Sequence, residues 1–490
     1  MNRTLPSSID EDSARYLSFL RRYPAYAATN ALDALRQREF ARLDASGDAY
    51  LDYTGGSLYP ASLVNRHAEF LLNNVLGNPH SHNNSSLKSS ALLTQARRDV
   101  LDYFGASPEE YLVLFTANAS AALKLVGESY PFDANSELLI TADNHNSVQG
   151  IREFARRRGA CVRYIGCQPD TLLADDITPY LADGDSAPGN KLLAYPAQSN
   201  FSGVQHPLSW IAQAQQAGYD VLLDGAAFVP TNRLDLARHS PDFVSLSFYK
   251  IFGYPTGVGA LIAKRKALAK LRRPWFAGGT VKIVSAVADF YALEEGEAAF
   301  EEGTVNYLSM PAISAGLEFM RDIGIDRLHE RVSLLAAYLL EEMQALQHRN
   351  GRPAIEPYGP TTMAQRGATI AFNVIDPEAN YLHYASIERL ANEAGIAVRS
   401  GCFCNPGAGE SSLGHTSETI NRCRQTVAAV DNSAKGFDLP RFQACIVSQG
   451  KATGAVRISL GLASNFADVD RGLQFLRGLL DRPASTLNAD

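Results

Sequence analysis

A lysine at position 250 lies between a β-prone run and a glycine-rich turn, and the stretch 245–259 reads Ser-Leu-Ser-Phe-Tyr-Lys-Ile-Phe-Gly-Tyr-Pro-Thr-Gly-Val-Gly. A lysine in such a place can form an imine with an aldehyde, so Lys250 predicts a pyridoxal phosphate site. That cofactor also requires an acid opposite its ring nitrogen, hydrogen-bond donors for its phosphate and an aromatic side chain over its ring. Each of these has a candidate earlier in the chain.

The candidate acid is Asp224, which ends the apolar run 219–223 and precedes a small-residue turn. A carboxylate at the C-terminal end of a strand faces the crevice where open α/β sheets bind ligands. Beside a pyridine nitrogen it would keep that nitrogen protonated and make the ring an electron sink. The alternative interpretation is a helix N-cap.

The candidate phosphate site is the segment 113–125, a β-prone run followed by a small-residue turn and helix-forming residues. The N-terminus of a helix presents free N–H groups and a partial positive charge, which suit a dianion. Ala119 and Ser120 lie at that turn, and the hydroxyls of Ser120 and Ser247 would add donors. The alternative is an ordinary strand–helix connection.

His145 is the candidate aromatic residue, just past the apolar run 138–140. Its imidazole could stack on the cofactor ring and transfer protons. A solvated turn histidine is the alternative. The order along the chain, with turn, histidine, aspartate and lysine each after its own strand, favours the catalytic interpretation.

Two cysteines, Cys402 and Cys404, lie in a segment rich in glycine, proline and asparagine, which predicts a loop that can move. A thiolate there could reach a substrate held on the cofactor, and neighbouring Arg399 would favour its ionisation. A metal site and a disulfide are the alternatives. No second closely spaced Cys/His pair matches this one, and a bridge between residues two apart would be strained.

The elements that would position these residues follow an α/β pattern. After a helical segment at about 12–43, apolar runs alternate with helix-like stretches to about residue 310, as in a parallel sheet with crossover helices. A long helix-like stretch, 313–346, leads to a second group of apolar runs at 368–374, 396–399 and 455–460. The polar stretch 411–450 indicates an insertion or mobile loop near Cys404.

This pattern divides the chain into two predicted domains. We expect a large cofactor-binding domain at 45–310 and a smaller α+β domain at 311–490, with the N-terminal segment 1–44 packed on the smaller one. A chain of 490 residues that is 46% hydrophobic can bury two such cores.

The composition limits the classes of binding partner and the cell compartment that we expect. A net charge of −7 without a basic block argues against nucleic acid or an anionic membrane as the main partner. No apolar run approaches the roughly 18 residues of a membrane span, and the N-terminus is not typical of a signal peptide, so we expect a cytoplasmic protein. The six cysteines predict no disulfide framework, with Cys161, Cys167 and Cys445 structural.

Nine segments of the sequence share features with one known family, namely 50–53, 77–81, 115–117, 121–126, 195–203, 247–259, 300–304, 401–408 and 456–459. Together they resemble the class V aminotransferases, and within them the cysteine desulfurase-like part of molybdenum cofactor sulfurases. The resemblance extends from about residue 17 to the C-terminal region. It implies a pyridoxal phosphate fold of type I, the aspartate aminotransferase-like fold, in a homodimer.

The resemblance also implies a role for each matched residue. Lys250 would be the imine-forming lysine, Asp224 would bind the ring nitrogen and His145 would stack on the ring. Asn200 would contact the ring hydroxyl and the substrate, and Ala119, Ser120 and Ser247 the phosphate. Gly303 and Thr304 match a segment that comes from the neighbouring subunit in such dimers. Arg457, with Arg399 beside it, would bind the substrate carboxylate, and Cys404 would carry a persulfide.

The sequence differs from the family pattern at two residues, and one domain of the sulfurases is not recognised in it. Ala227 follows the Asp-Gly-Ala turn where many desulfurases have glutamine, as in the sulfurase branch. Gly409 stands where the sulfurase string tends to have a further cysteine. The cofactor-binding domain of molybdenum cofactor sulfurases is not recognised in this chain, so the resemblance does not by itself imply sulfur delivery to molybdenum.

We therefore predict an enzyme that takes sulfur from a small amino acid, L-cysteine, as a persulfide on Cys404 and releases L-alanine. A sulfur-acceptor protein or cofactor is a further expected partner, and no metal is expected. Other chemistry on the same cofactor, by a C–S lyase, an aminotransferase or an epimerase, is the alternative. A non-catalytic scaffold would be expected to have lost Lys250, Asp224 or Arg457, and all three are present.

Overall fold

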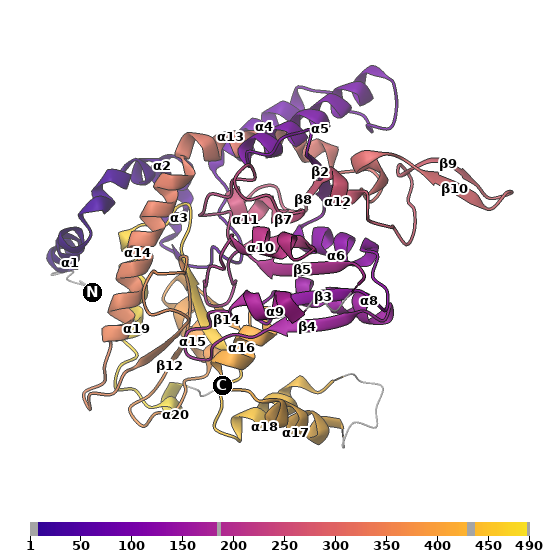
Figure 1. The fold of residues 1–490 in the computed structure, drawn as a ribbon. Helices are drawn as coiled ribbons and strands as arrows, with labels where there is room; N and C mark the ends of the chain where they lie inside the picture. Colours follow the sequence, from indigo (N-terminus) through magenta and orange to yellow (C-terminus); the bar gives the residue numbers. More distant parts are fainter. Residues whose placement is uncertain (1–7, 184–187, 429–436, 488–490) are drawn as a thin grey trace.

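The structure, a computed structural model, describes residues 8–183, 188–428 and 437–487. At its centre is a seven-stranded sheet in the order β2-β8-β7-β6-β5-β3-β4 (Figure 1). Only β8 runs against the other strands. The strands are β2 (Tyr111–Thr116), β3 (Glu137–Thr141), β4 (Cys161–Ile165), β5 (Lys191–Pro196), β6 (Tyr219–Asp224), β7 (Phe243–Ser247) and β8 (Gly259–Lys264).

The central strands read as continuous apolar runs because both of their faces are buried. In β3, Leu138 and Ile140 pack into one core while Leu139 packs into the other, as the two-residue period of a strand requires. Helices α6 (Ala119–Ser129) and α8 (Ile151–Arg157) line the first core. Helices α5 (Asn84–Tyr103), α10 (Trp210–Gln216) and α13 (Met310–Ile323) line the second. The sheet is therefore a middle layer between helices.

A smaller antiparallel sheet in the order β11-β12-β15-β14 lies in the C-terminal part of the chain. Its strands are β11 (Ile355–Tyr358), β12 (Thr369–Val374), β15 (Ala455–Ser459) and β14 (Arg399–Gly401). Beside it, β1 (Ala49–Tyr50) pairs with β13 (Ile396–Ala397), and Asp52 forms a bridge to Ser459. The segment around residue 50 is thereby joined to the C-terminal strands. Helix α15 (Tyr384–Glu393) contacts the edge strand β14.

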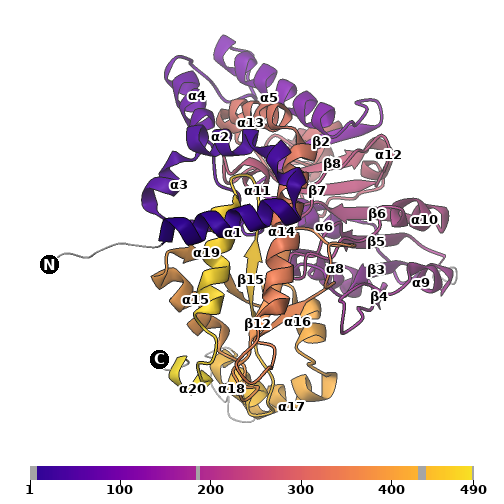
Figure 2. The same cartoon turned by 90° about the vertical axis from the view of Figure 1, so that its left-hand side faces the viewer.

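The N-terminal helix α1 (Ser8–Arg22) lies across α14 (Ile325–Ala345) and α19 (Phe466–Arg477), as Figure 2 shows. Phe19 is fully buried there, with its ring against those of Tyr338 and Phe466. The predicted helical segment 12–43 is broken into α1, the 3₁₀ helix η1 (Pro24–Thr29), α2 (Ala31–Glu39) and α3 (Ala41–Ser46). The proline that opens η1 is one reason, since its ring cannot continue a helix.

The long helix predicted over 313–346 is two helices, α13 and α14. They are separated by Gly324, whose φ of 79° belongs to the left-handed region. Glycine adopts that region without a steric penalty, so the chain turns there and both apolar faces can pack. The sequence prediction was wrong at this position because one glycine is also tolerated inside a helix.

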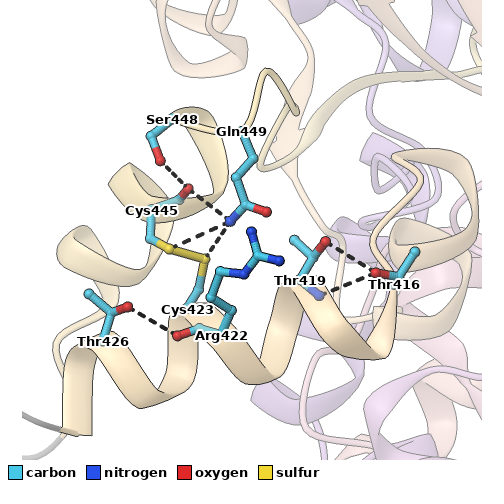
Figure 3. The surroundings of a disulfide bond; sticks show 8 residues. All are labelled: Thr416, Thr419, Arg422, Cys423, Thr426, Cys445, Ser448 and Gln449. Atoms are coloured by element: carbon cyan, nitrogen blue, oxygen red, sulfur yellow. Dashed lines mark hydrogen bonds between the residues drawn. A yellow bond between two sulfur atoms is a disulfide. The ribbon is translucent and has the colours of Figure 1, made fainter.

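The polar stretch 411–450 contains helices as well as connecting segments. Helix α16 (Pro406–Ser412) leads to α17 (Ser417–Ala428) and α18 (Leu439–Val447), which pack side by side at one end of the molecule (Figure 1). A disulfide joins Cys423 of α17 to Cys445 of α18, with Cα atoms 5.6 Å apart (Figure 3). The sequence analysis predicted no disulfide framework and did not foresee this single bond.

A hairpin of β9 (Val281–Ser285) and β10 (Phe290–Leu293) projects from the large sheet's side of the molecule (Figure 1). It carries an unusual number of exposed apolar side chains, namely Ile283, Val284, Val287, Phe290 and Tyr291. Among the described residues, no helix has both the length and the apolar character needed to span a bilayer.

Candidate functional site

A cavity of about 320 Å³ lies where the loops after β2, β3, β5, β6 and β7 meet. Loops that follow parallel strands converge at the carboxyl edge of a sheet, so residues far apart in sequence gather there. The cavity is lined by seven of the residues predicted from the sequence, namely Ala119, Ser120, His145, Asn200, Asp224, Ser247 and Lys250.

Lys250 lies in the short helix α11 (Phe248–Phe252), which begins directly after β7. This helix ends at Gly253, where a Cβ atom would lie 2.4 Å from backbone atoms of Leu58 and Tyr59, so only glycine fits. Within the described chain the Lys250 amine forms no hydrogen bond or ion pair. Burial lowers its pKa, and the negative charge of Asp224 opposes that shift. An amine whose pKa is lowered by burial and that has no partner among the described residues fits covalent attachment of an aldehyde cofactor.

Asp224 ends β6 and is almost fully buried, at 7% exposure. Its Oδ1 atom accepts hydrogen bonds from the Ser245 hydroxyl at 2.8 Å and from the Ala226 N–H at 3.1 Å. These bonds hold the carboxylate at the strand end while Oδ2 receives none from the described residues. The carboxylate thus caps its own turn and still offers an acceptor to a protonated ring nitrogen.

The N-terminus of α6 also lines the cavity. Asn118 caps this helix, its side chain accepting from the Ala121 N–H, and the Ala119 N–H donates to the Ser247 hydroxyl at 2.9 Å. At Gly259 a Cβ atom would lie 2.5 Å from the Asn118 carbonyl carbon, so glycine lets β8 approach the turn. A helix N-terminus with two serine hydroxyls nearby, those of Ser120 and Ser247, is suited to a phosphate dianion.

His145 is the N-cap of α7 (Asn146–Gln149), and its Nδ1 accepts a hydrogen bond from the Ser147 N–H at 3.1 Å. Because Nδ1 accepts, the neutral ring carries its hydrogen on Nε2. Burial lowers the pKa of His145, the charges of Lys250 and Arg457 add to that effect, and the charge of Asp224 opposes it. The ring is thereby favoured in its neutral form, which can stack on a cofactor and relay protons.

The two arginines predicted to bind substrate are neighbours across strands β14 and β15, where Arg399 pairs with Arg457. Arg457 is 2% exposed, and its Nη groups donate to the Asn200 carbonyl at 2.8 Å and to Asp52 at 2.9 Å. Its Nε has no partner within the described chain. Arg399 donates to the same Asp52 carboxylate at 2.7 Å. One carboxylate therefore orients both guanidinium groups.

This arrangement differs from the prediction that Arg399 would act on the Cys404 thiol. The hydrogen bonds of Arg399 go to Asp52, which compensates its positive charge, and Asp52 raises the pKa of Arg399 through these bonds. The sequence placed Arg399 five residues before Cys404 but did not show that a carboxylate near the N-terminus would bind it.

The thiols of Cys402 and Cys404 are both exposed. The loop between β14 and α16 that carries them was predicted to be mobile, and in the structure its backbone accepts two hydrogen bonds from neighbouring segments. The Asn146 N–H donates to the Cys404 carbonyl at 2.7 Å, and the Asn200 side chain donates to the Phe403 carbonyl at 2.6 Å. The loop therefore lies against the turn that carries His145.

Gly303 and Thr304 do not line this cavity in the single chain. Thr304 faces an adjoining cavity of about 220 Å³ that shares Ala117 and Gly257 with the first. Its hydroxyl accepts a 3.3 Å hydrogen bond from the Asn78 side chain. Gly303 has a φ of 73°, which a side chain would disfavour.

Several residues of the site were not assigned a role from the sequence. Gln198 and Tyr249 also line the cavity. Asp52 lay inside the segment 50–53 that carried the family resemblance, and Asn405 lay inside 401–408, so both were available as candidates. Their roles depend on contacts with residues hundreds of positions away, which no local pattern shows.

Comparisons with known proteins agree with this geometry. The model of the aminotransferase class-V family matches residues 49–471. Molybdenum cofactor sulfurase from Bos taurus is 37% identical over 467 residues, which cover 91% of this chain and 51% of that protein. The chain spans between 51% and 60% of the length of the curated relatives it matches.

Solved structures share the fold. The apo structure of the cysteine desulfurase from Thermococcus onnurineus NA1 has a TM-score of 0.73 at 23% identity, covering 91% of this chain and 98% of that one. A C-DES variant with glycine covalently linked to its pyridoxal phosphate has a TM-score of 0.65 at 18% identity, covering 90% and 98%. The predicted α/β fold of type I is confirmed by these likenesses and by the mainly parallel central sheet.

Proposed function

This chain belongs to the aminotransferase class-V family, and from that premise we propose that it is a pyridoxal phosphate enzyme that acts as a cysteine desulfurase. The amino acid would be L-cysteine and the products L-alanine and a persulfide on Cys404. The proposal is supported by the names of relatives that are 34% to 37% identical over most of this chain, all of them molybdenum cofactor sulfurases. Sulfur delivery to a molybdenum cofactor is a property of those longer proteins.

Three independent features of the cavity fit pyridoxal phosphate. The Lys250 amine and one oxygen of the Asp224 carboxylate have no hydrogen-bond partner among the described residues, and the N-terminus of α6 carries Ser120. When bound, this cofactor supplies an aldehyde that condenses with amines and a protonated ring that withdraws electrons from the substrate Cα. Asp224 would keep the ring nitrogen protonated, and His145 would cover the ring face.

The remaining residues would act on the amino acid itself. Lys250, once exchanged for the substrate amine, would be the base that removes the Cα proton. Arg457 would bind the substrate carboxylate, a task that suits the fixed donor geometry of a guanidinium. Asn200 would hold the substrate from the side of the cavity next to the cysteine loop.

Cys404 would then take the sulfur. Its thiolate attacks the sulfur of bound L-cysteine, an S–S bond forms and the Cβ–S bond of the substrate breaks. The electron pair of that bond stays with the carbon skeleton, which takes up one proton at Cβ, regains one at Cα from the Lys250 ammonium group and leaves as L-alanine. A sulfur acceptor, protein or cofactor, would regenerate the thiol.

The observation that carries this proposal is the exposed Cys404 thiol on a loop tied to the His145 turn. The test is mass spectrometry of the protein incubated with L-cysteine without reductant, after loading with pyridoxal phosphate. An additional sulfur on the peptide that contains Cys404, with one alanine released per sulfur bound, is expected. Turnover of L-cysteine without any persulfide on Cys404 would instead assign the site to the alternative chemistry of a lyase, aminotransferase or epimerase.

We further propose that the enzyme works as a homodimer. Thr304 faces the cavity next to the cofactor site, and the β9–β10 hairpin exposes apolar side chains that include Ile283 and Phe290. Exposed apolar patches of this kind often mark association surfaces. Light scattering of the purified protein should give twice the chain mass of 53.1 kDa, and a monomer mass that persists at high concentration would contradict the proposal.

A further inference from the structure

Two consecutive residues of the cysteine loop have left-handed backbone conformations. The φ angles are 53° at Phe403 and 55° at Cys404, and neither residue is glycine. Such conformations are unfavourable for residues with side chains and persist only where surrounding contacts hold them. The conformation that presents the Cys404 thiol is therefore imposed by the rest of the fold.

The Asn405 side chain makes several of the contacts that hold this loop. It is fully buried, and its Nδ2 group donates to the Asp143 carbonyl at 2.6 Å and to Oδ1 of Asn200 at 2.9 Å. Its own Oδ1 accepts from the Ala408 N–H at 3.2 Å and so caps α16. An amide is the one short side chain that offers both two donors and an acceptor here.

The partner amide, Asn200, completes a reciprocal arrangement. Its Oδ1 accepts from Asn405 while its Nδ2 donates to the Phe403 carbonyl at 2.6 Å. Its backbone carbonyl accepts from Arg457. Asn200 also lines the cofactor cavity. One residue thus contacts the cavity, the cysteine loop and the arginine proposed to bind the substrate.

Close backbone packing beneath the cysteine loop also joins it to the turn that carries His145. At Gly407 a Cβ atom would lie 2.1 Å from the carbonyl oxygen of Ala142, which belongs to the segment leading from β3 to His145. Only glycine lets α16 approach so closely. The cysteine loop and the His145 turn are therefore joined by direct backbone contact at Gly407 and by the Asn405 amide.

Building on the proposed desulfurase function, we propose that Asn405 is a positioning residue for Cys404. Through its hydrogen bonds to Asn200 and Asp143 it fixes the loop so that the thiol stands at a set place relative to the cofactor cavity. Asn405 takes no part in the chemistry at Cα, since none of its bonds reaches Lys250 or Asp224. Its removal should impair sulfur transfer selectively.

The test uses the full chain loaded with pyridoxal phosphate and the variant Asn405→Asp. Aspartate keeps the size of the side chain and the oxygen that caps the Ala408 N–H, but it loses the NH₂ donor. The oxygen that replaces this donor would face the Asp143 carbonyl oxygen and Oδ1 of Asn200. Asn405→Ser, which adds no charge, is the second variant. Asn83→Asp, at an exposed N-cap of α5, is the matched control.

The first readout is hydrogen–deuterium exchange, which does not depend on activity. The Asn146 and Asn405 N–H groups, which donate to the Cys404 and Cys402 carbonyls, should exchange at least about tenfold faster in both Asn405 variants and unchanged in the control. Wild-type exchange in both variants would overturn the positioning role. If wild type forms no persulfide, the desulfurase proposal fails, yet this readout still decides whether Asn405 holds the loop.

The second readout separates two steps of the reaction. Deuterium incorporation at Cα of L-alanine, which does not need Cys404, should stay within about threefold of wild type, because Lys250 and Asp224 are untouched. Persulfide formation from L-cysteine should fall by about tenfold or more. Equal losses in both steps would assign Asn405 a general structural role and contradict the proposal, as would wild-type persulfide formation in Asn405→Ser.

Discussion

The guanidinium group of Arg457 donates a 2.9 Å hydrogen bond to the carboxylate of Asp52, which lies 405 residues earlier in the chain. Both side chains are nearly buried, at 2% and 7% exposure. The same carboxylate binds Arg399 on the neighbouring strand. Asp52 therefore orients both guanidinium groups, which we propose bind the substrate carboxylate.

Asp52→Asn should weaken substrate binding and lower stability. Loss of the carboxylate leaves the Arg457 charge buried without compensation, and breaking such a pair costs about 3 kcal/mol or more of unfolding free energy. We expect the KM for L-cysteine to rise about tenfold or more and the urea midpoint to fall. Asp326→Asn, which breaks the exposed pair with Arg233, should change neither measurably. Wild-type KM in the Asp52 variant would contradict this role.

The pH dependence of cofactor attachment should reflect Lys250. Its neutral amine is the nucleophile, so the attachment rate should rise with pH and level off once the pH exceeds the amine's pKa. Burial lowers that pKa, so the plateau should come at lower pH than for an exposed lysine. Stopped-flow absorbance of the apo protein mixed with pyridoxal phosphate measures this. Lys250→Ala should give no lysine-bound absorbance band, and an adduct on another lysine after borohydride reduction would refute the assignment.

Asp224→Ala should reduce turnover by orders of magnitude. Without the carboxylate the ring nitrogen is no longer held protonated. The activation free energy should then rise by about 3 to 4 kcal/mol, the scale of electrostatic stabilisation of a transition state. Cofactor loading should be affected much less, because the α6 N-terminus and the serines proposed to hold the phosphate are unchanged in this variant. Deuterium exchange at Cα of L-alanine measures the effect, and a near-normal rate in the variant would count against this role.

Cys404→Ser and Cys402→Ser should behave differently although the two thiols are both exposed. The Cys404 variant should still bind cofactor and exchange the Cα proton of L-alanine but release no sulfide from L-cysteine under reducing conditions. The Cys402 variant should retain most of the activity, because Cys402 lies two residues before Cys404, whose carbonyl is bound to the His145 turn. Normal sulfide release by the Cys404 variant would eliminate the desulfurase proposal.

The disulfide between Cys423 and Cys445 should be detectable by counting thiols. Alkylation of the unreduced protein should label the four free cysteines, and reduction should raise the count to six. The bridge closes a loop of moderate length, for which chain entropy predicts about 3 kcal/mol of stabilisation. Cys423→Ser should therefore promote proteolysis within the α17–α18 helices, whereas Cys161→Ser should not. Six reactive thiols in protein purified without reductant would show that the bridge does not form there.

Much of the cofactor site could be predicted from the sequence because its residues lie at the ends of strands. Lys250, Asp224 and His145 each follow an apolar run, and in a parallel sheet such positions meet at one edge whatever the details of packing. The alternation of runs and helix-like stretches also predicted the layered α/β fold. These signals are local, so they can be seen without knowing which distant segments touch.

Tertiary contacts decided the rest. Asp52 meets Arg457 only because β1 is carried to the C-terminal strands, and Asn405 meets Asn200 across 205 residues. The break at Gly324 and the pairing of Cys423 with Cys445 likewise depend on how helices pack. A local pattern limits what a segment can form, whereas the choice among long-range partners follows from the whole chain burying its apolar surface at once. For this protein the sequence determined the cofactor chemistry, and the fold determined which contacts hold Arg457 and the Cys404 loop.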